Sequence, residues 1–162
     1  MSPVGVGDPL PAVTLPRLGG GEVTIPVAGK PTLLLFTKSS CPTCTWAAPL
    51  FRELHERLGG SSLAVVAVAQ DDEDAESEFA REHRLGYPVA LESSPWRLAA
   101  DLGLTTVPTA VYVDADGRCG LVSPGFARDD LVGVAERVAA HDGTGPRAPF
   151  AAGDDVPAFR PG

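Results

Sequence analysis

Apolar residues along the chain fall either into short continuous runs or into segments with helical spacing. Residues 32–37, Thr-Leu-Leu-Leu-Phe-Thr, form a continuous apolar run, which is typical of a strand buried on both faces. From Cys44 to Leu58, apolar side chains recur at helical spacing, which predicts an amphipathic helix that ends at Gly59-Gly60. A buried strand followed closely by a helix is therefore the first feature that the pattern predicts.

The same alternation continues to residue 140. Further strands are predicted at residues 63–69, 88–91, 109–114 and 118–122, and further helices at residues 71–84, 95–102 and 128–140. Two short apolar runs near the N-terminus, residues 12–15 and 22–25, flank three consecutive glycines and predict a hairpin. The acidic residues 71–78 are interpreted as the solvated start of their helix. Strands that alternate with helices predict an α/β fold, in which helices flank a central mixed sheet.

One domain accounts for the predicted elements. The sequence has 162 residues, which is enough for a single domain with a sizeable core. We expect this domain to span residues 1–141. Residues 142–162 are rich in Gly, Pro and Ala and carry scattered charges, so we predict a flexible tail there.

Charge and hydropathy exclude several classes of partner. The formal net charge is −8 and no run rich in Lys or Arg is present, so neither a nucleic-acid nor an anionic-membrane partner is expected. No apolar run approaches the roughly 20 residues that span a bilayer. Residues 1–7 lack the basic start and apolar core of a secretory signal peptide, so the sequence predicts a cytoplasmic protein.

The chemistry of the chain is concentrated in the motif Cys41-Pro42-Thr43-Cys44. The chain contains three cysteines, and this small odd number does not indicate a structural disulfide framework. The motif lies between the buried strand and the helix, where unpaired backbone N–H groups and the helix dipole stabilise a thiolate. Pro42 suits the first helical position. Residues three apart share a helix face, so the two sulfurs can reach bonding distance.

Position along the helix assigns a role to each cysteine. Cys41, at the exposed junction, is expected to attack a disulfide, and Cys44, one turn deeper, to resolve the mixed disulfide. No cofactor is expected beyond the redox-active Cys41–Cys44 disulfide itself. No metal site is predicted, because zinc needs a second ligand pair, Cys119 stands alone and the three histidines show no paired spacing. An inert pair of buried thiols is the alternative.

With these motifs the chain resembles the thioredoxin superfamily, and within it the TlpA-like and AhpC/TSA branch. Residues 6–15 resemble the opening strand of that branch, and residues 33–44 its active-site strand and motif. Pro49 falls where the family kinks its active-site helix, and residues 106–109, Thr-Val-Pro-Thr, resemble its cis-proline loop. The similarity covers residues 6–140. It implies a thioredoxin-like fold with an N-terminal β-hairpin extension, and thiol–disulfide oxidoreductase activity.

The resemblance also implies where a substrate binds. It implies a cis Val107–Pro108 bond beside the cysteines, with the Val107 backbone free to pair with an extended substrate; a trans proline at the start of a strand is the alternative. Pro42, Thr43 and Trp46 are the other candidate substrate-binding residues, although Trp46 could equally pack on a neighbouring loop. The expected partners are a protein or small-molecule disulfide and an electron donor such as a thioredoxin- or glutathione-type system.

Departures from the family pattern keep other functions open. Leu35 stands where ordinary thioredoxins have a buried acid that assists proton transfer to the second cysteine. An antioxidant thiol peroxidase of the peroxiredoxin type is one alternative, but Lys38 occupies the threonine position of the peroxiredoxin signature, a leucine occupies its proline position, and no arginine is placed beside Pro108. A thiol-dependent binding module or metal carrier would use the same two thiolates.

Overall fold

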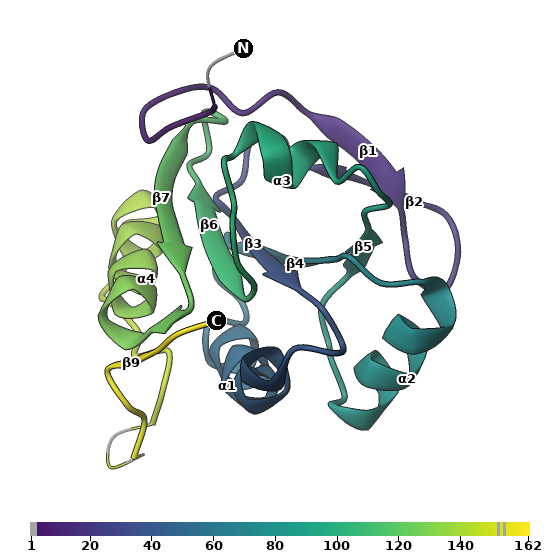
Figure 1. Ribbon diagram of the computed structural model, residues 1–162. Helices are drawn as coiled ribbons and strands as arrows, with labels where there is room; N and C mark the ends of the chain where they lie inside the picture. The colour runs from purple at the N-terminus through teal and green to yellow at the C-terminus, as the bar shows by residue number, and fades with distance from the viewer. Residues whose placement is uncertain (1–2, 152, 154) are drawn as a thin grey trace.

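A five-stranded mixed sheet forms the centre of the protein (Figure 1). The computed structural model describes residues 3–151, 153 and 155–162. The strands are β1 Val13–Pro16, β2 Glu22–Ile25, β3 Thr32–Thr37, β4 Ala64–Ala69, β5 Val89–Leu91, β6 Thr109–Val113, β7 Cys119–Pro124, β8 Phe126–Ala127 and β9 Phe159–Arg160. The helices are α1 Pro42–Arg57, α2 Glu73–Glu82, α3 Arg97–Asp101 and α4 Arg128–Asp142.

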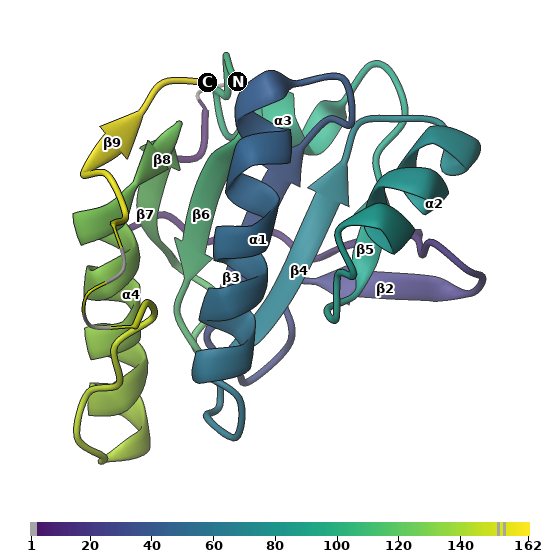
Figure 2. The same cartoon turned by 90° about the horizontal axis from the view of Figure 1, so that it is seen from below.

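Strand β3 occupies the middle of the central sheet, whose order is β5-β4-β3-β6-β7. It pairs with β4 in parallel and with β6 antiparallel, and all of its residues are buried. Its side chains alternate between the two cores: Leu33 and Leu35 face the core under α1 and α4, and Leu34 and Phe36 face the core under α3 and the N-terminal hairpin. Figure 2 shows α1 and α4 on one side of the sheet, and Figure 1 shows α3 and the β1–β2 hairpin on the other. A strand covered on both faces explains the continuous apolar run.

The predicted fold class is confirmed. The elements follow the predicted order, the N-terminal hairpin is present, and the antiparallel β6–β7 pair forms one edge of the sheet. The helix predicted at residues 71–84 is shorter, because the Asp72 carboxylate accepts the Ala75 N–H at 2.8 Å and so caps the helix start. No helix in the described part of the chain is long and apolar enough to cross a membrane.

The segment after α4 folds back onto the domain. The domain boundary at residue 141 and the flexibility of residues 142–162 stay predictions. The structure shows contacts between this segment and the domain that the sequence analysis did not predict. Strand β9 pairs antiparallel with β8, and the Arg128 N–H donates to the Ala158 carbonyl at 2.9 Å. Phe150 and Val156 are buried in the core under α1 and α4. This segment therefore takes part in the packing of the domain.

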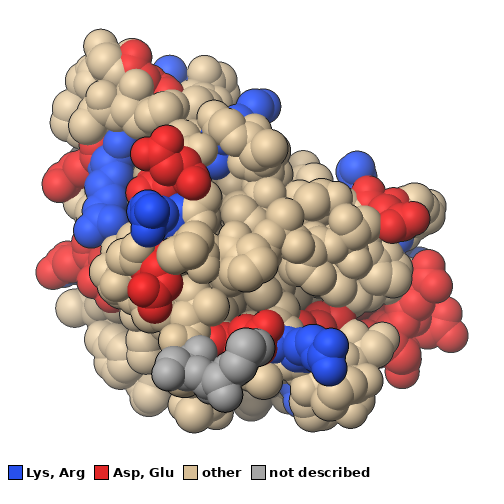
Figure 3. Space-filling view, turned by 90° about the horizontal axis from the view of Figure 1, so that it is seen from above, with Lys and Arg blue, Asp and Glu red and all other residues tan. Residues whose placement is uncertain are grey.

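One face of the molecule is mixed in charge. On the face that carries α3, basic and acidic side chains are interspersed around a broad uncharged area (Figure 3). Among the described residues that this view shows, Lys and Arg do not form one continuous patch. This surface therefore offers no basic groove of the kind that follows a phosphate backbone.

Candidate active site

The structure places Cys41 at the start of α1, immediately before Pro42. Its sulfur accepts the Cys44 N–H at 3.1 Å and so acts as the N-cap of the helix. Cys41 is partly exposed, whereas Cys44 is only 1% exposed and lies on the face of the helix that enters the core. All three cysteines of the chain are free thiols. The two cysteines of the motif therefore lie together, one accessible and one covered.

The environment of Cys44 disfavours its thiolate. Burial raises the pKa of the Cys44 thiol well above its ordinary value, and the hydrogen bond with Cys41 raises it further. The negative charge of Asp71 acts in the same direction, while a hydrogen bond from the Lys38 backbone opposes them. Cys44 therefore keeps its proton at neutral pH, and it becomes a nucleophile only when a base removes that proton.

The loop before β6 lies against the cysteines. The Val107–Pro108 bond is cis, as the resemblance implies, and the Cys41 Sγ donates to the Val107 carbonyl at 3.4 Å. The Thr109 hydroxyl donates to the Thr106 carbonyl at 2.8 Å and closes the loop on itself. The role of Val107 and Pro108 in substrate binding stays a prediction, but the structure brings the carbonyl of Val107, the residue before the cis proline, to the Cys41 sulfur.

The other candidate substrate-binding residues lie on the first turns of α1. Pro42 is exposed, and the buried Thr43 hydroxyl donates to the Pro161 carbonyl at 2.8 Å. Trp46 packs edge-on against Phe126 with 5.2 Å between ring centroids. The Arg160 guanidinium lies 4.8 Å from the centre of the Trp46 ring. Thr43 and Trp46 are thus in contact with the segment after α4, which the sequence did not indicate.

A pocket of about 310 Å³ opens beside the cis-proline loop. Its lining includes Lys38, Trp96, Thr106 and Val107, and the Lys38 ammonium lies 4.8 Å from the centre of the Trp96 ring. Trp96 was not predicted as a site residue, because it stands far from the motif in the sequence and in no recognisable pattern. No tryptophan precedes the cysteine motif in the sequence, but Trp96 lines this pocket beside the cis-proline loop.

Two neighbouring acidic residues, Asp71 and Glu76, follow strand β4. Both polar groups of Ser39 donate to Asp71, the backbone N–H at 2.7 Å and the hydroxyl at 3.1 Å. Glu76 on α2 is completely buried, and neither of its carboxylate oxygens has a hydrogen-bond partner among the described residues. Burial, followed by the neighbouring Asp71 carboxyl, raises the pKa of Glu76 to about 8. The prediction that residues 71–78 form a solvated helix start is therefore wrong for Glu76.

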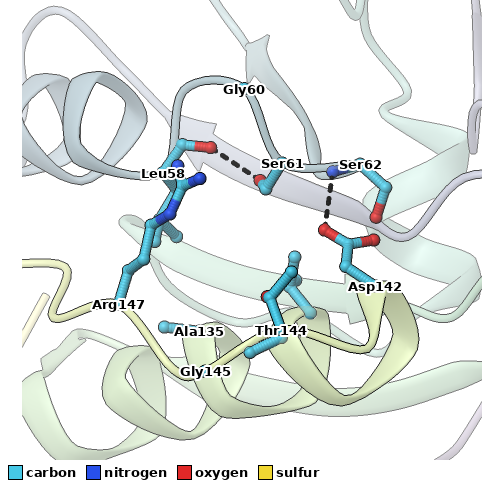
Figure 4. Close-up of a pocket in the computed structure, with 11 residues that line it drawn as sticks. Leu58, Gly60, Ser61, Ser62, Ala135, Asp142, Thr144, Gly145 and Arg147 are labelled. Atoms are coloured by element: carbon cyan, nitrogen blue, oxygen red, sulfur yellow. Dashed lines mark hydrogen bonds between the residues drawn. The ribbon is translucent and has the colours of Figure 1, made fainter.

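The surface hollow in Figure 4 belongs to a different part of the molecule. It has a volume of about 360 Å³ and lies between the C-terminal ends of α1 and α4, at the opposite end of α1 from Cys41. The Ser62 N–H donates to the Asp142 carboxylate at 3.0 Å there. Among the residues that the structure describes, no three His, Cys, Asp or Glu side chains gather in a way that could hold a metal ion. This hollow contains none of the predicted site residues.

The chain is similar to a known family and to proteins of that fold. The AhpC/TSA family matches residues 6–119. Sporulation thiol-disulfide oxidoreductase A of Bacillus subtilis is 26% identical over 114 residues, which cover 67% of this chain and 68% of that protein. Methylamine utilization protein MauD of Methylorubrum extorquens is 32% identical over 115 residues, which cover 69% of this chain and 54% of MauD. The chain therefore spans about half the length of the latter relative.

Solved structures with the same fold include two further oxidoreductases. The thioredoxin domain of a thiol-disulfide oxidoreductase from Bacteroides vulgatus aligns with a TM-score of 0.74 at 20% identity, covering 83% of this chain and 97% of that one. A secreted Mycobacterium tuberculosis disulfide oxidoreductase homologous to DsbE aligns with a TM-score of 0.66 at 25% identity, covering 79% and 95%. The thioredoxin-like fold is confirmed by these alignments.

The buried Glu76 should make stability depend on pH. Its pKa rises from an ordinary value of 4.5 to about 8, so between these pH values the folded state holds a proton that the unfolded state releases. The free energy of unfolding should therefore fall as the pH rises from about 5 to about 8. Each pKa unit corresponds to about 1.4 kcal/mol, so Glu76→Gln should stabilise the protein by roughly 2–4 kcal/mol at pH 8 and much less at pH 5.

Denaturant unfolding at a series of pH values measures this difference. Glu78→Gln is the matched control, because Glu78 is exposed on the same helix and its substitution should leave the pH dependence unchanged. If Glu76→Gln unfolds with the same pH dependence as the unaltered protein, Glu76 does not carry this proton.

Proposed function

The chain belongs to the AhpC/TSA family, and from this premise we propose that it is a thiol–disulfide oxidoreductase that works through Cys41 and Cys44. One observation carries the proposal. The Cys41 sulfur lies at the N-terminus of α1, accepts the Cys44 N–H at 3.1 Å and is 3.4 Å from the Val107 carbonyl oxygen. The partly exposed Cys41 sulfur thus has the second cysteine on one side and the Val107 carbonyl on the other. The Bacillus subtilis relative is named a thiol-disulfide oxidoreductase, which supports the same activity for this chain.

The proposed reaction proceeds in two exchanges. The Cys41 thiolate attacks one sulfur of a disulfide, forms a mixed disulfide with it and releases the second substrate sulfur as a thiolate, which takes up a proton. Cys44 then loses its proton, attacks the Cys41 sulfur and releases the remaining substrate thiolate. The products are the Cys41–Cys44 disulfide and a substrate reduced by two electrons, and the reverse sequence oxidises a dithiol.

A proton acceptor for Cys44 is needed in this scheme, and we propose Asp71. Leu35 leaves no acid at the position that ordinary thioredoxins use, but the Asp71 charge reaches Cys44, and Ser39 fixes that carboxylate with two hydrogen bonds. Because a carboxylate close to a thiol both disfavours the thiolate and can accept its proton, Asp71 suits the resolving step rather than the first attack.

The substrate is proposed to bind across the cis-proline loop. An extended disulfide substrate would pair with the Val107 backbone, contact Pro42 and place a side chain in the pocket lined by Lys38 and Trp96. The proposed partners are a protein or small-molecule disulfide and an electron donor of the thioredoxin or glutathione type. The cytoplasmic location stays a prediction, and the secreted Mycobacterium relative has the same fold, so the fold does not fix the compartment.

Trapping tests the two cysteine roles. Cys44→Ser should accumulate a covalent mixed disulfide at Cys41 when the reduced protein meets a disulfide substrate, because the resolving thiol is missing. Cys41→Ser should accumulate none, because Cys44 is buried. Non-reducing electrophoresis with mass mapping distinguishes the adducts. Trapping at Cys44 in the Cys41→Ser protein, or faster alkylation of Cys44 than of Cys41 at limiting reagent, would reverse the assignment.

Substitution of Asp71 tests the proton acceptor. Asp71→Asn should slow the conversion of the mixed disulfide to the Cys41–Cys44 disulfide by roughly tenfold or more, with the first attack little changed. Asp74→Asn, an exposed carboxylate on α2, is the control and should change neither step. Stopped-flow measurement of both phases decides, and equal effects of the two substitutions would exclude Asp71 from the role.

Peroxide reactivity separates the proposal from the peroxidase alternative. A peroxidatic cysteine needs donors that polarise the O–O bond, and Lys38, at the position of the peroxiredoxin threonine, lies over Trp96. Reduced protein should therefore react slowly with hydrogen peroxide and quickly with a small disulfide in stopped-flow experiments. Saturating peroxide turnover that disappears in Cys41→Ser would instead establish a thiol peroxidase.

A further inference from the structure

Residues 158–162, here called the C-terminal segment, lie over the start of α1. Figures 1 and 2 both place the C-terminus beside the first turn of this helix, next to the cysteine motif. The sequence of this segment, Ala-Phe-Arg-Pro-Gly, contains no cysteine and no acidic residue. Its place in the fold, rather than its own chemistry, is what connects it to the reaction.

Four contacts hold the C-terminal segment there. Its backbone pairs with β8, with Arg160 opposite Phe126, and its first carbonyl, that of Ala158, accepts the Arg128 N–H at 2.9 Å. The Arg160 guanidinium covers the Trp46 ring at 4.8 Å. The Pro161 carbonyl accepts the Thr43 hydroxyl at 2.8 Å, within the Cys-Pro-Thr-Cys motif itself.

The end of the segment lies against the cis-proline loop. A Cβ atom on Gly162 would overlap the Val107 carbonyl oxygen and come within 2.6 Å of the Thr106 hydroxyl oxygen. The same Val107 carbonyl is 3.4 Å from the Cys41 sulfur. The C-terminal segment therefore occupies, in extended conformation, the surface where the proposed function places the backbone of a substrate.

We propose that the C-terminal segment determines which disulfides reach Cys41. A small disulfide needs only the partly exposed sulfur and the pocket beside Lys38, which the segment leaves open. A disulfide within an extended peptide needs the Val107 backbone and reacts only after the segment has moved away. This inference rests on the proposed function, because it assigns an occupant to the substrate groove of that function.

The contacts of the segment suit an occupant that can leave. The β8–β9 pairing covers only two residue pairs, and Phe159 is 56% exposed. Among the described residues, Arg160 makes a ring contact but no ion pair. Segments with few buried apolar contacts and exposed backbone bonds open at much lower cost than the core. The segment therefore competes with a peptide substrate without closing the site permanently.

A glycine substitution at the end of the segment tests the proposal without shortening the chain. Gly162→Ala adds a Cβ that the Val107 carbonyl does not accommodate, so it should displace the segment. Gly145→Ala is the matched control, since a Cβ there meets no atom within 4 Å. The probes are hydroxyethyl disulfide and an unstructured peptide that contains one disulfide. Exchange with the reduced protein is followed by stopped flow.

The expected result is a change in selectivity. Gly162→Ala should raise the peptide exchange rate about fivefold or more, because the displaced segment no longer covers the surface that the peptide needs. The exchange rate with hydroxyethyl disulfide should change less than about twofold, because that probe does not need this surface. Gly145→Ala should change neither rate. Arg160→Gln, which loses the contact with Trp46, should shift the peptide rate in the same direction and serves as a second variant.

The inference and the proposed function are contradicted by different results. If Gly162→Ala and Arg160→Gln leave the peptide rate unchanged or lower it, the C-terminal segment does not restrict peptides, and the inference is overturned while the proposed function stands. If the unaltered protein does not exchange with hydroxyethyl disulfide either, the proposed function itself fails, and the inference fails with it.

Discussion

The hydrogen bond from the Cys44 N–H to the Cys41 sulfur is the interaction on which the site depends. A helix start needs an acceptor for its free N–H groups, and oxygen side chains usually supply it. Here a sulfur does so, and the first turn of α1 contains no acidic residue that would compete for the positive end of the helix. The same atom therefore caps the helix and is the proposed nucleophile. The buried strand β3 fixes where that helix begins, because it is held by hydrogen-bonded neighbours on both sides.

Much of the fold could be predicted because the chain alternates its patterns cleanly. A short continuous apolar run is typical of a strand covered on both faces, and β3 is such a strand. The cysteine pair was predicted from a short motif between a strand and a helix. The cis Val107–Pro108 bond was implied by the resemblance of residues 106–109 to a family motif. Both kinds of motif are short and can be recognised in a single sequence.

Three features of the site could not be predicted, and each has a physical reason. Glu76 lies among exposed acidic residues on a polar helix, so the pattern gives no sign that one carboxyl points inward. Trp96 reaches the pocket through the packing of α3 on the sheet, which no spacing in the sequence encodes. The contact of Thr43 with Pro161 joins positions 118 residues apart, and the second of them lies in a Gly- and Pro-rich stretch without periodicity. Composition predicts that such a stretch lacks long helices and strands, but it does not indicate which part of the folded domain the stretch contacts.

Residues Gly125 and Phe126 connect the cis-proline loop to the C-terminal segment. The Gly125 N–H donates to the Pro108 carbonyl at 2.8 Å, and the backbone of Phe126 pairs with Arg160. A side chain at Gly125 would come within 2.7 Å of the Arg160 carbonyl oxygen, and the Phe126 ring packs in the core against Phe51. One short stretch of backbone therefore bears on the cis-proline loop, the C-terminal segment and the core together. A shift of that stretch would disturb all three, so the aromatic packing around Phe126 supports the surroundings of Cys41 from inside the protein.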